Sequence, residues 1–296
     1  GSSPAFPTAT IPRDLATLHL IKDAYTAGIN MAVYEGSRDC RMALSAYSNG
    51  RPRLMGIINC TPDSFHQDSQ HGDLQKALQM LDEGADWIDI GGESTRPGSQ
   101  PVTIEQEINR TITIIEQLRS KTDCFISIDT RHQKVAHAAL QAGADMINDV
   151  AGLRDPKMFD LVLSSGCAVC IMHMKGEPKE MQNDPSYGDV FKEVYHQLIV
   201  TARRLVNAGH DPNLIVLDPG IGFGKTVDHN LEILNGLSIF HGLGVPLLVG
   251  TSRKSFIGKI TGEKVAENRV SGSIAAMLLC LEQGVQIVRV HDVEQA

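Results

Sequence analysis

The sequence predicts an α/β protein whose architecture is a (β/α)8 barrel, also called a TIM barrel, and two observations favour this class. From about residue 53, short β-branched apolar runs alternate with longer stretches of helical periodicity, as parallel βαβ units require. There are eight such runs. The roughly 244 residues from 53 to 296 match the length of about 250 that is typical of a barrel closed by eight strands.

The expected strands, in chain order, cover residues 54–59, 87–92, 124–129, 146–150, 168–173, 214–218, 246–251 and 285–291. The expected helices between them cover residues 74–83, 103–120, 131–142, 156–164, 190–208, 228–237 and 266–282. Several helices run into a glycine, at Gly84, Gly143 and Gly209, and glycine favours the left-handed conformation that ends a helix. An open doubly wound sheet is the alternative, but no G-x-G-x-x-G opens the first unit.

The two ends of the chain differ from the repeating part. Residues 1–52 are expected to form an N-terminal helical extension, with helices near 14–32 and 39–47, before a barrel domain over residues 53–296. Only five residues follow His291, so we expect a final helix that is shortened or missing. Such a barrel would expose part of its outer apolar face, and we expect the N-terminal helix to cover it.

The composition of the chain argues against several classes of binding partner. The formal net charge is −8, which argues against a nucleic-acid or membrane-surface protein. No apolar run reaches the ~18 residues of a membrane span. Six cysteines and no charged-then-apolar leader suit a cytoplasmic protein with free thiols. Cys167 and Cys170 form a lone C-x-x-C without a second pair at zinc spacing, so we expect structural thiols there.

Polar residues follow all eight expected strands, and the carboxyl ends of barrel strands share the face where active sites lie. Arg289 and His291 are two apart on the last strand, so their side chains leave the same face. The run Ser252-Arg-Lys-Ser255 follows strand seven. Loops after strands seven and eight hold phosphate in this fold, and arginine and lysine bind phosphate oxygens. We therefore expect an anionic ligand of the phosphate-ester class.

Asp129, Asn148 and Asp218 follow three middle strands and offer acceptors and an amide instead of cations. Such groups bind the N–H edge of a flat heterocycle, although an acid and base pair for glycoside hydrolysis is an open alternative. Residues 218–226 end in Gly-Lys-Thr, which suggests a P-loop. Pro219 occupies the position of the first P-loop glycine, so the motif fails.

Eight motifs together resemble the dihydropteroate synthase family of pterin-binding TIM-barrel transferases. They occur in order from residue 55 to 292 and read MGIINCTPDSF, DIGGESTRPG, SIDT, INDV, MHM, DPGIGFGKT, SRKS and RVHD. The family condenses 6-hydroxymethyl-7,8-dihydropterin pyrophosphate with para-aminobenzoate, giving 7,8-dihydropteroate and pyrophosphate. The resemblance implies these two small-molecule substrates, Mg²⁺ as the cofactor and a dissociative substitution without a covalent nucleophile.

The resemblance also implies roles for the residues that match the motifs. Contacts to the pterin edge fall on Asp129, Asn148, Asp218 and Lys254, with Met172 and Phe223 as apolar walls. The pyrophosphate and magnesium site falls on Asn59, Arg289 and His291. The para-aminobenzoate site falls on Phe65, Thr95, Arg96, Pro97 and Ser255. Asp63 is the further catalytic acid, and Gly250 is a further substrate contact.

The chain departs from the family pattern at three places. The first loop continues as His66-Gln-Asp-Ser69 where the family has Ser-Asp-Gly-Gly, so we assign its second acid, a metal ligand, to Asp68. Cys60 replaces the usual valine. Family dimers use the side of the barrel where the last helix is shortened, so a homodimer is possible. A pterin-domain methyltransferase and a catalytically silent pterin-binding protein are the rival interpretations.

Overall fold

The computed structural model describes residues 51–60, 67–94, 102–177 and 180–296. It contains eight parallel strands: β1 (Arg53–Asn59), β2 (Trp87–Gly91), β3 (Phe125–Asp129), β4 (Met146–Asp149), β5 (Ala168–Met172), β6 (Ile215–Asp218), β7 (Leu248–Val249) and β8 (Ile287–Val290). They form one sheet in the order β6-β5-β4-β3-β2-β1-β8-β7. A bridge between Leu217 and Leu247 joins the two edge strands, so the sheet closes into the predicted barrel.

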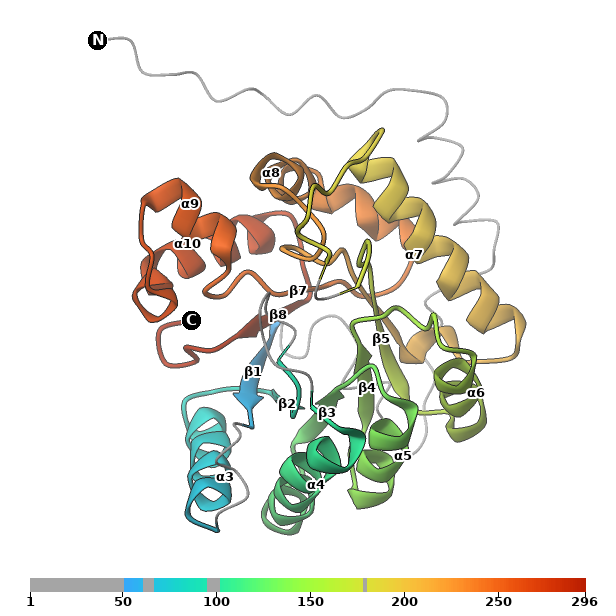
Figure 1. Cartoon of the computed structure of the whole chain (residues 1–296), viewed down its shortest axis with the longest axis vertical. Coiled ribbons are helices and arrows are strands. Elements are labelled where there is room, and N and C mark those ends of the chain that lie inside the picture. Colours follow the sequence, from blue (N-terminus) through green and yellow to red (C-terminus); the bar gives the residue numbers. More distant parts are fainter. Residues whose placement is uncertain (1–50, 61–66, 95–101, 178–179) are drawn as a thin grey trace.

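Helices surround the barrel, as Figure 1 shows. They are α3 (Gln67–Asp82), α4 (Ile104–Lys121), α5 (Gln133–Ala142), α6 (Pro156–Ser165), α7 (Val190–Asn207), α8 (Val227–Asn235), α9 (Ser255–Thr261) and α10 (Val270–Glu282). Short 3-10 helices precede β6 and β7 and connect α9 to α10. The predicted (β/α)8 fold class is confirmed, and helices follow strands as expected.

Local signals explain where the helices begin and end. At the start of α4, the Thr103 hydroxyl accepts a hydrogen bond from the Gln106 backbone N–H at 3.2 Å, and the Gln106 side chain accepts one from the Thr103 N–H at 3.0 Å. This capping box satisfies backbone donors that the first turn leaves unpaired. Gly143 ends α5 with φ of +108°, and Gly84 and Gly209 also adopt positive φ, as the sequence predicted.

Four elements differ from the sequence prediction. Helix α3 begins at Gln67 instead of residue 74, and α9 was not predicted. The single helix expected over 266–282 divides into a 3-10 turn (Ala266–Arg269) and α10. Strand β7 is only two residues long, where residues 246–251 were expected.

The ends of the chain were predicted to carry an N-terminal extension and a reduced final helix. Residues 291–296 form no helix after β8, which agrees with the second prediction. The N-terminal helices near 14–32 and 39–47, and their expected cover over the barrel, lie outside the described residues. Within the described ranges, no helix combines the length and apolar character that crossing a membrane needs. The cytoplasmic location stays a prediction.

Side chains inside the barrel change from apolar to polar along the strands. The amino ends contribute a layer of apolar side chains, namely Met55, Trp87, Phe125, Met146, Ala168, Leu214, Leu248 and Ile287. The rings of Trp87 and Phe125 are 4.5 Å apart in this layer. Side chains alternate along a strand, so Asp89, Asp129 and Arg289 point to the same interior at a higher level. The carboxyl end of the barrel is therefore the polar end.

Arg119 joins α4 to the amino end of the barrel. Its guanidinium donates to the backbone carbonyls of Gly143 and Cys124 and to the Asp145 carboxylate, at 2.5–3.0 Å. Asp145 also accepts from the Ile126 N–H at 2.8 Å. This network ties one helix to two neighbouring strands on the face opposite to the polar end. The five cysteines in the described part of the chain are free thiols, as expected, and Cys40 lies outside it.

Candidate active site

The polar end of the barrel opens into a cavity of about 270 Å³. Seven of the residues predicted from the sequence line this cavity: Asn59, Asp129, Phe223, Lys254, Ser255, Arg289 and His291. They come from β1, β3 and β8 and from the loops after β6 and β7, which are far apart in the chain. The barrel topology brings these separate strand ends to one place.

Arg289 lines the cavity and is held by two carboxylates. Its Nε donates to Asp89 at 2.6 Å, and a terminal nitrogen donates to Asp129 at 2.7 Å. Asp89 is fully buried and also accepts from the Asn148 side-chain amide at 3.2 Å. Burial opposes the charge on Arg289, but Asp89 and Asp129 outweigh it and raise the pKa of the guanidinium. Arg289 is thus a permanent, oriented cation.

Asp129 is the carboxylate whose ionisation is most open to change. Burial raises its pKa to about 7, the nearby Asp89 charge adds to this effect, and Arg289 opposes it. A carboxyl group that titrates near neutrality can accept a proton or donate a hydrogen bond. Asp129 sits beside both Arg289 and the open cavity, so it can do either toward a ligand.

Lys254, Asp218 and Phe223 form the second part of the site. The Lys254 ammonium lies 4.5 Å from the centre of the Phe223 ring and donates to the Ile221 carbonyl. Burial lowers the pKa of Lys254 to about 8, and the nearby Asp218 carboxylate opposes this change. The Asp218 carboxylate accepts from the Gly220 N–H at 2.7 Å. A cation, a carboxylate and an aromatic face together suit a flat polar heterocycle.

His291 and Ser252 form a pair above Arg289. The Ser252 hydroxyl lies 3.0 Å from His291 Nδ1 and accepts from the His291 backbone N–H at 3.2 Å. The next residue, Arg253, adopts a left-handed backbone with φ of +58°. Its guanidinium pairs with Asp292, and its N–H donates to the Ser273 hydroxyl at 2.8 Å. These contacts hold the turn after β7 against α10 and the end of β8.

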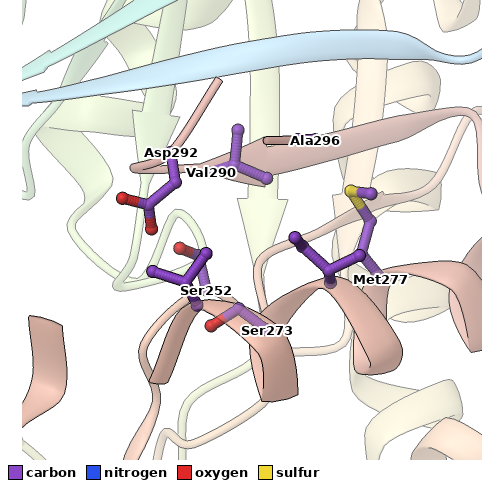
Figure 2. A pocket seen from close by; sticks show the side chains of 8 residues that line it. Ser252, Ser273, Met277, Val290, Asp292 and Ala296 are labelled. Carbon is purple, nitrogen blue, oxygen red and sulfur yellow. The ribbon is translucent and has the colours of Figure 1, made fainter. Parts of the chain in front are cut away.

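A second, much smaller pocket lies behind this turn. Figure 2 shows Ser273 and Met277 of α10 facing Val290 of β8 and Asp292 beyond it. Its volume is about 10 Å³, which is the space of roughly one water molecule. The pocket is too small for a substrate, and it holds none of the predicted site residues except Ser252 of the run after β7.

Within the described residues, Asn59 and one cluster of three side chains offer ligand atoms for a metal ion. Asn59 lines the cavity and offers an amide oxygen, which fits Mg²⁺ because this ion takes few protein oxygens and completes its shell with water and substrate phosphates. At the rim, ligand atoms of Glu93, Glu107 and His132 lie within 4.8 Å of one another. Arg131 donates to Glu93 at 3.0 Å, and His132 lies 3.5 Å from it, so Glu93 already has cationic partners. We describe this rim as an ion-pair network.

The other predicted residues fall into two sets. Asn148, Asp218, Met172 and Gly250 are buried beneath the cavity and do not line it. Met172 packs with Met174, Met181 and Phe223. Gly250 lies beside Arg289, whose Cβ is 3.6 Å from the place that a Cβ on Gly250 would take. The remaining predictions, Asp63, Phe65, Thr95, Arg96 and Pro97, lie outside the described residues. Asp68 belongs to α3, and its side chain is not described.

Sequence reasoning gave no role to several residues that shape the site. Asp89 was noted only as the first residue of a motif, although a charged residue between two buried isoleucines is a signal. Glu93 lies within the second family motif and Ser252 within the run expected to bind an anion, but the sequence predicts no individual role for either. Met181 and Arg269 also line the cavity; Met181 comes from the loop after β5 and Arg269 from the 3-10 turn before α10, and neither belongs to a sequence motif.

Comparisons with known proteins agree with this geometry. A family model described as pterin binding enzyme matches residues 55–291. Dihydropteroate synthase from Escherichia coli (strain K12) is 42% identical over 248 residues, covering 82% of this chain and 88% of that protein. The enzyme from Synechocystis sp. is 44% identical over 249 residues, covering 82% of this chain and 86% of that protein.

Solved structures show the same relationship. The Yersinia pestis dihydropteroate synthase, in a sulfonamide drug complex, has a TM-score of 0.79 and 42% identity, covering 83% of this chain and 90% of that chain. The Xanthomonas albilineans enzyme in complex with 7,8-dihydropteroate has a TM-score of 0.75 and 41% identity, covering 83% and 89%. The chain therefore belongs to the pterin-binding enzymes. Within that family it groups with the dihydropteroate synthases and is a transferase of their class.

Proposed function

We propose that this chain condenses 6-hydroxymethyl-7,8-dihydropterin pyrophosphate with para-aminobenzoate, forming 7,8-dihydropteroate and pyrophosphate. The observation that carries the proposal is that one cavity contains both cationic side chains and a carboxyl group. Arg289 and Lys254 supply positive charge and His291 an imidazole beside them, while the Asp129 carboxyl lies within the same space. A substrate with an anionic tail and a hydrogen-bonding ring satisfies both.

The pterin ring would lie between Lys254 and the floor of the barrel. Asp218 and Asn148 are buried there, and the N–H groups along a pterin edge are donors that suit a carboxylate and an amide oxygen. Asn148 donates its amide nitrogen to Asp89, so its oxygen is left free to accept. Phe223, with Met181 beside it, would supply an apolar wall for the ring.

The pyrophosphate would lie against Arg289 and His291. Breaking the carbon–oxygen bond places additional negative charge on the departing pyrophosphate, and oriented cations stabilise this charge as it develops. Arg289 is held by two carboxylates and needs no reorganisation during the step. Asn59 and an acid of the first loop would hold Mg²⁺, which when bound neutralises phosphate charge.

The carbon–nitrogen bond would form by a dissociative route. Loss of pyrophosphate leaves a pterin-methyl cation, and the amine of para-aminobenzoate adds to it and then releases a proton. The chain's task is to hold the amine in line and to exclude water. Ser255 lies at the cavity edge, where it would contact para-aminobenzoate together with Phe65, Thr95, Arg96 and Pro97.

The direct test is pyrophosphate release with Mg²⁺ present, measured with and without para-aminobenzoate. We expect release to depend on both. Lys254→Ala and Arg289→Ala should each lower turnover at least ~10²-fold, because each removes a charged contact at a desolvated site. Lys157→Ala, an exposed residue of α6, is the control and should act as wild type. Tight pterin binding without any pyrophosphate release would identify a catalytically silent protein instead.

We also propose that the protein forms a homodimer through the α9–α10 side of the barrel. Ile260, Val265, Leu278 and Leu279 are half exposed there, at 50–56%. Apolar side chains gathered on one face favour association. Light scattering should give a dimer mass, and Leu278→Glu combined with Leu279→Glu should give a monomer; a wild-type monomer at micromolar concentration would reject the proposal.

A further inference from the structure

Lys225 is the lysine of the Gly-Lys-Thr run, and the proposed reaction gives it no role. It does not line the cavity, and only 3% of it is exposed. It lies directly behind the loop of residues 219–224, whose outer side faces the cavity through Gly222 and Phe223. A buried ammonium group is costly unless its donors are satisfied, so its partners indicate what it does.

All three donors of the Lys225 ammonium have an acceptor. Nζ donates to the backbone carbonyls of Gly220 and Phe223 at 2.8 and 3.0 Å, and it lies 3.0 Å from His173 Nδ1. Burial lowers the pKa of Lys225 to about 7, and the nearby Asp218 carboxylate opposes this change. In its charged form Lys225 can only donate, so His173 Nδ1 accepts and the imidazole is neutral. Burial, and then the Lys225 charge, lower the pKa of His173 to about 3, which agrees with this assignment.

The two carbonyls that Lys225 holds stand on either side of Ile221. The Ile221 carbonyl accepts from Lys254 Nζ, and Phe223 supplies the ring over which that ammonium lies. Gly222 also packs closely on Lys254, because a Cβ there would come within 2.9 Å of the lysine Cδ. The loop therefore contacts Lys254 on its cavity side, and Lys225 binds the opposite side of the same loop.

The loop has little freedom to hold this shape in another way. Gly220 has φ of +69°, and a Cβ on it would come within 1.8 Å of the His173 carbonyl oxygen. The Phe223 N–H closes a turn on the Gly220 carbonyl at 3.1 Å, and this is the same carbonyl that Lys225 binds. Losing the ammonium would leave the Phe223 carbonyl without its lysine donor and the Gly220 carbonyl with the Phe223 N–H alone, and the turn would loosen.

Lys225 also acts on the charge of Asp218. Burial raises the pKa of the Asp218 carboxyl, whereas Lys254 and Lys225 both lower it. The carboxylate is thus flanked by one lysine on the cavity side and one behind the loop. Lys225 thus fixes the loop that contacts Lys254 and lowers the pKa of Asp218, and both of these residues are predicted contacts of the pterin edge.

We propose that Lys225 is a positioning residue for pterin binding: it fixes the 219–224 loop so that Ile221 and Phe223 align Lys254 toward the pterin. The assignment rests on the proposed function, since pterin is the ligand that Lys254 and Asp218 would contact. On this proposal, the lysine of the Gly-Lys-Thr run supports the pterin site from behind the loop and does not bind a phosphate as the lysine of a P-loop does.

The test uses Lys225→Met, which keeps the apolar stem and removes all donors. Lys175→Met is the control, because Lys175 binds the Ser186 carbonyl and Glu193 but not the carbonyls of the loop. We expect Lys225→Met to weaken binding of the pterin pyrophosphate at least tenfold by calorimetry. The KM for para-aminobenzoate at saturating pterin should change less than threefold. Lys175→Met should change the pterin affinity less than twofold.

Hydrogen exchange provides a readout that needs no substrate. Backbone amides of residues 220–224 should exchange at least tenfold faster in Lys225→Met and at the wild-type rate in Lys175→Met. Unchanged exchange, or pterin affinity within twofold of wild type, overturns the proposal. An equal loss of pterin and para-aminobenzoate binding also overturns it, since it would indicate a general structural role.

A second pair of variants covers the case in which Lys225→Met does not fold. His173→Leu removes one acceptor of Lys225, and His173→Asn retains an acceptor. Loop exchange should increase about threefold in His173→Leu and stay near wild type in His173→Asn. Equal exchange in both variants counts against the proposal. If wild type fails to bind the pterin pyrophosphate while the exchange results hold, the proposed function fails and the role of Lys225 in fixing the loop stands.

Discussion

Replacing Asp89 by asparagine tests whether the buried carboxylate is what orients Arg289. Asp89 is fully buried and accepts from Arg289 at 2.6 Å and from Asn148 at 3.2 Å. Hydrogen bonds to charged groups are worth about 1.5–3 kcal/mol each, and neutral ones about 1 kcal/mol. Asparagine keeps the volume and one acceptor, and Asp129 still binds Arg289. We therefore expect Asp89→Asn to lower the free energy of unfolding by about 2–3 kcal/mol.

A loss of this size shifts the melting temperature by about 5–10 °C, since 1 kcal/mol corresponds to about 2–4 °C for a domain of this length. Thermal unfolding measures it directly. The decisive experiment adds Arg289→Met. That substitution alone leaves Asp89 and Asp129 as buried carboxylates without their cation, and we expect a loss of about 3–5 kcal/mol. Asp89→Asn should then be neutral or stabilising in the Arg289→Met background.

The sign of this second effect is the critical outcome. If the two losses simply add within about 0.5 kcal/mol, the charges of Asp89 and Arg289 are not coupled. The view of Arg289 as a cation held in place by its carboxylates would then be wrong. Its proposed role toward pyrophosphate would have to rest on another source of orientation.

Three further predictions concern single residues. The pKa of Lys254 is lowered to about 8, so the ammonium is lost as pH rises through that value. The kcat/KM for the pterin substrate should therefore fall above pH 8. A kcat/KM that stays constant up to pH 9.5 would contradict this prediction. Unfolding free energy should instead rise over the same interval, because the unfolded lysine binds more protons. Arg119→Ala should cost about 2 kcal/mol in melts while leaving kcat/KM within twofold, since it breaks the Asp145 network far from the cavity. Gly220→Ala should raise the KM for pterin at least tenfold, because the new Cβ would collide with the His173 carbonyl; normal KM would show that the loop can move.

The alternation of strands and helices was predictable because each unit carries its own local signal. Seven of the eight strands lie close to the expected ranges, since short β-branched runs bounded by polar residues mark them. Strand β7 is the exception. Leu248 and Val249 pair with β8 and Leu247 forms a single bridge to β6, and beyond them Gly250 leads to the turn that carries Lys254. Apolar composition indicates a buried segment, but it does not show where its ladder ends.

Helix α9 could not be predicted for a related reason. It has seven residues and contains Gly258, so neither its length nor its propensity is that of an autonomous helix. It forms because Phe256 and Ile257 are buried against the barrel. Helix α3 shows the opposite case, since its first turns from Gln67 are polar and give no apolar periodicity for a sequence pattern to detect.

In the site, the positions of residues can be predicted from the sequence, but the contacts between them cannot. The positions of Asp129, Lys254, Arg289 and His291 follow from the rule that strand ends share one face. Their partners do not follow from it. Arg289 is separated by 200 residues from Asp89 and by 160 from Asp129, and only the register of a closed barrel brings them together. Nothing local to β8 indicates which carboxylate its arginine will meet.

Asp89 explains why the polar end of the barrel can be both stable and reactive. A barrel interior filled by apolar layers would not tolerate a bare arginine, because burying an unpaired charge is costly. Asp89 sits one inward position above Trp87, at the boundary between the apolar layer and the cavity. It balances the charge of Arg289 from below and leaves the upper side of the guanidinium to Asp129 and the ligand. Asp89 thus allows the fold to hold the buried charge of Arg289, although we do not expect Asp89 itself to touch the substrate.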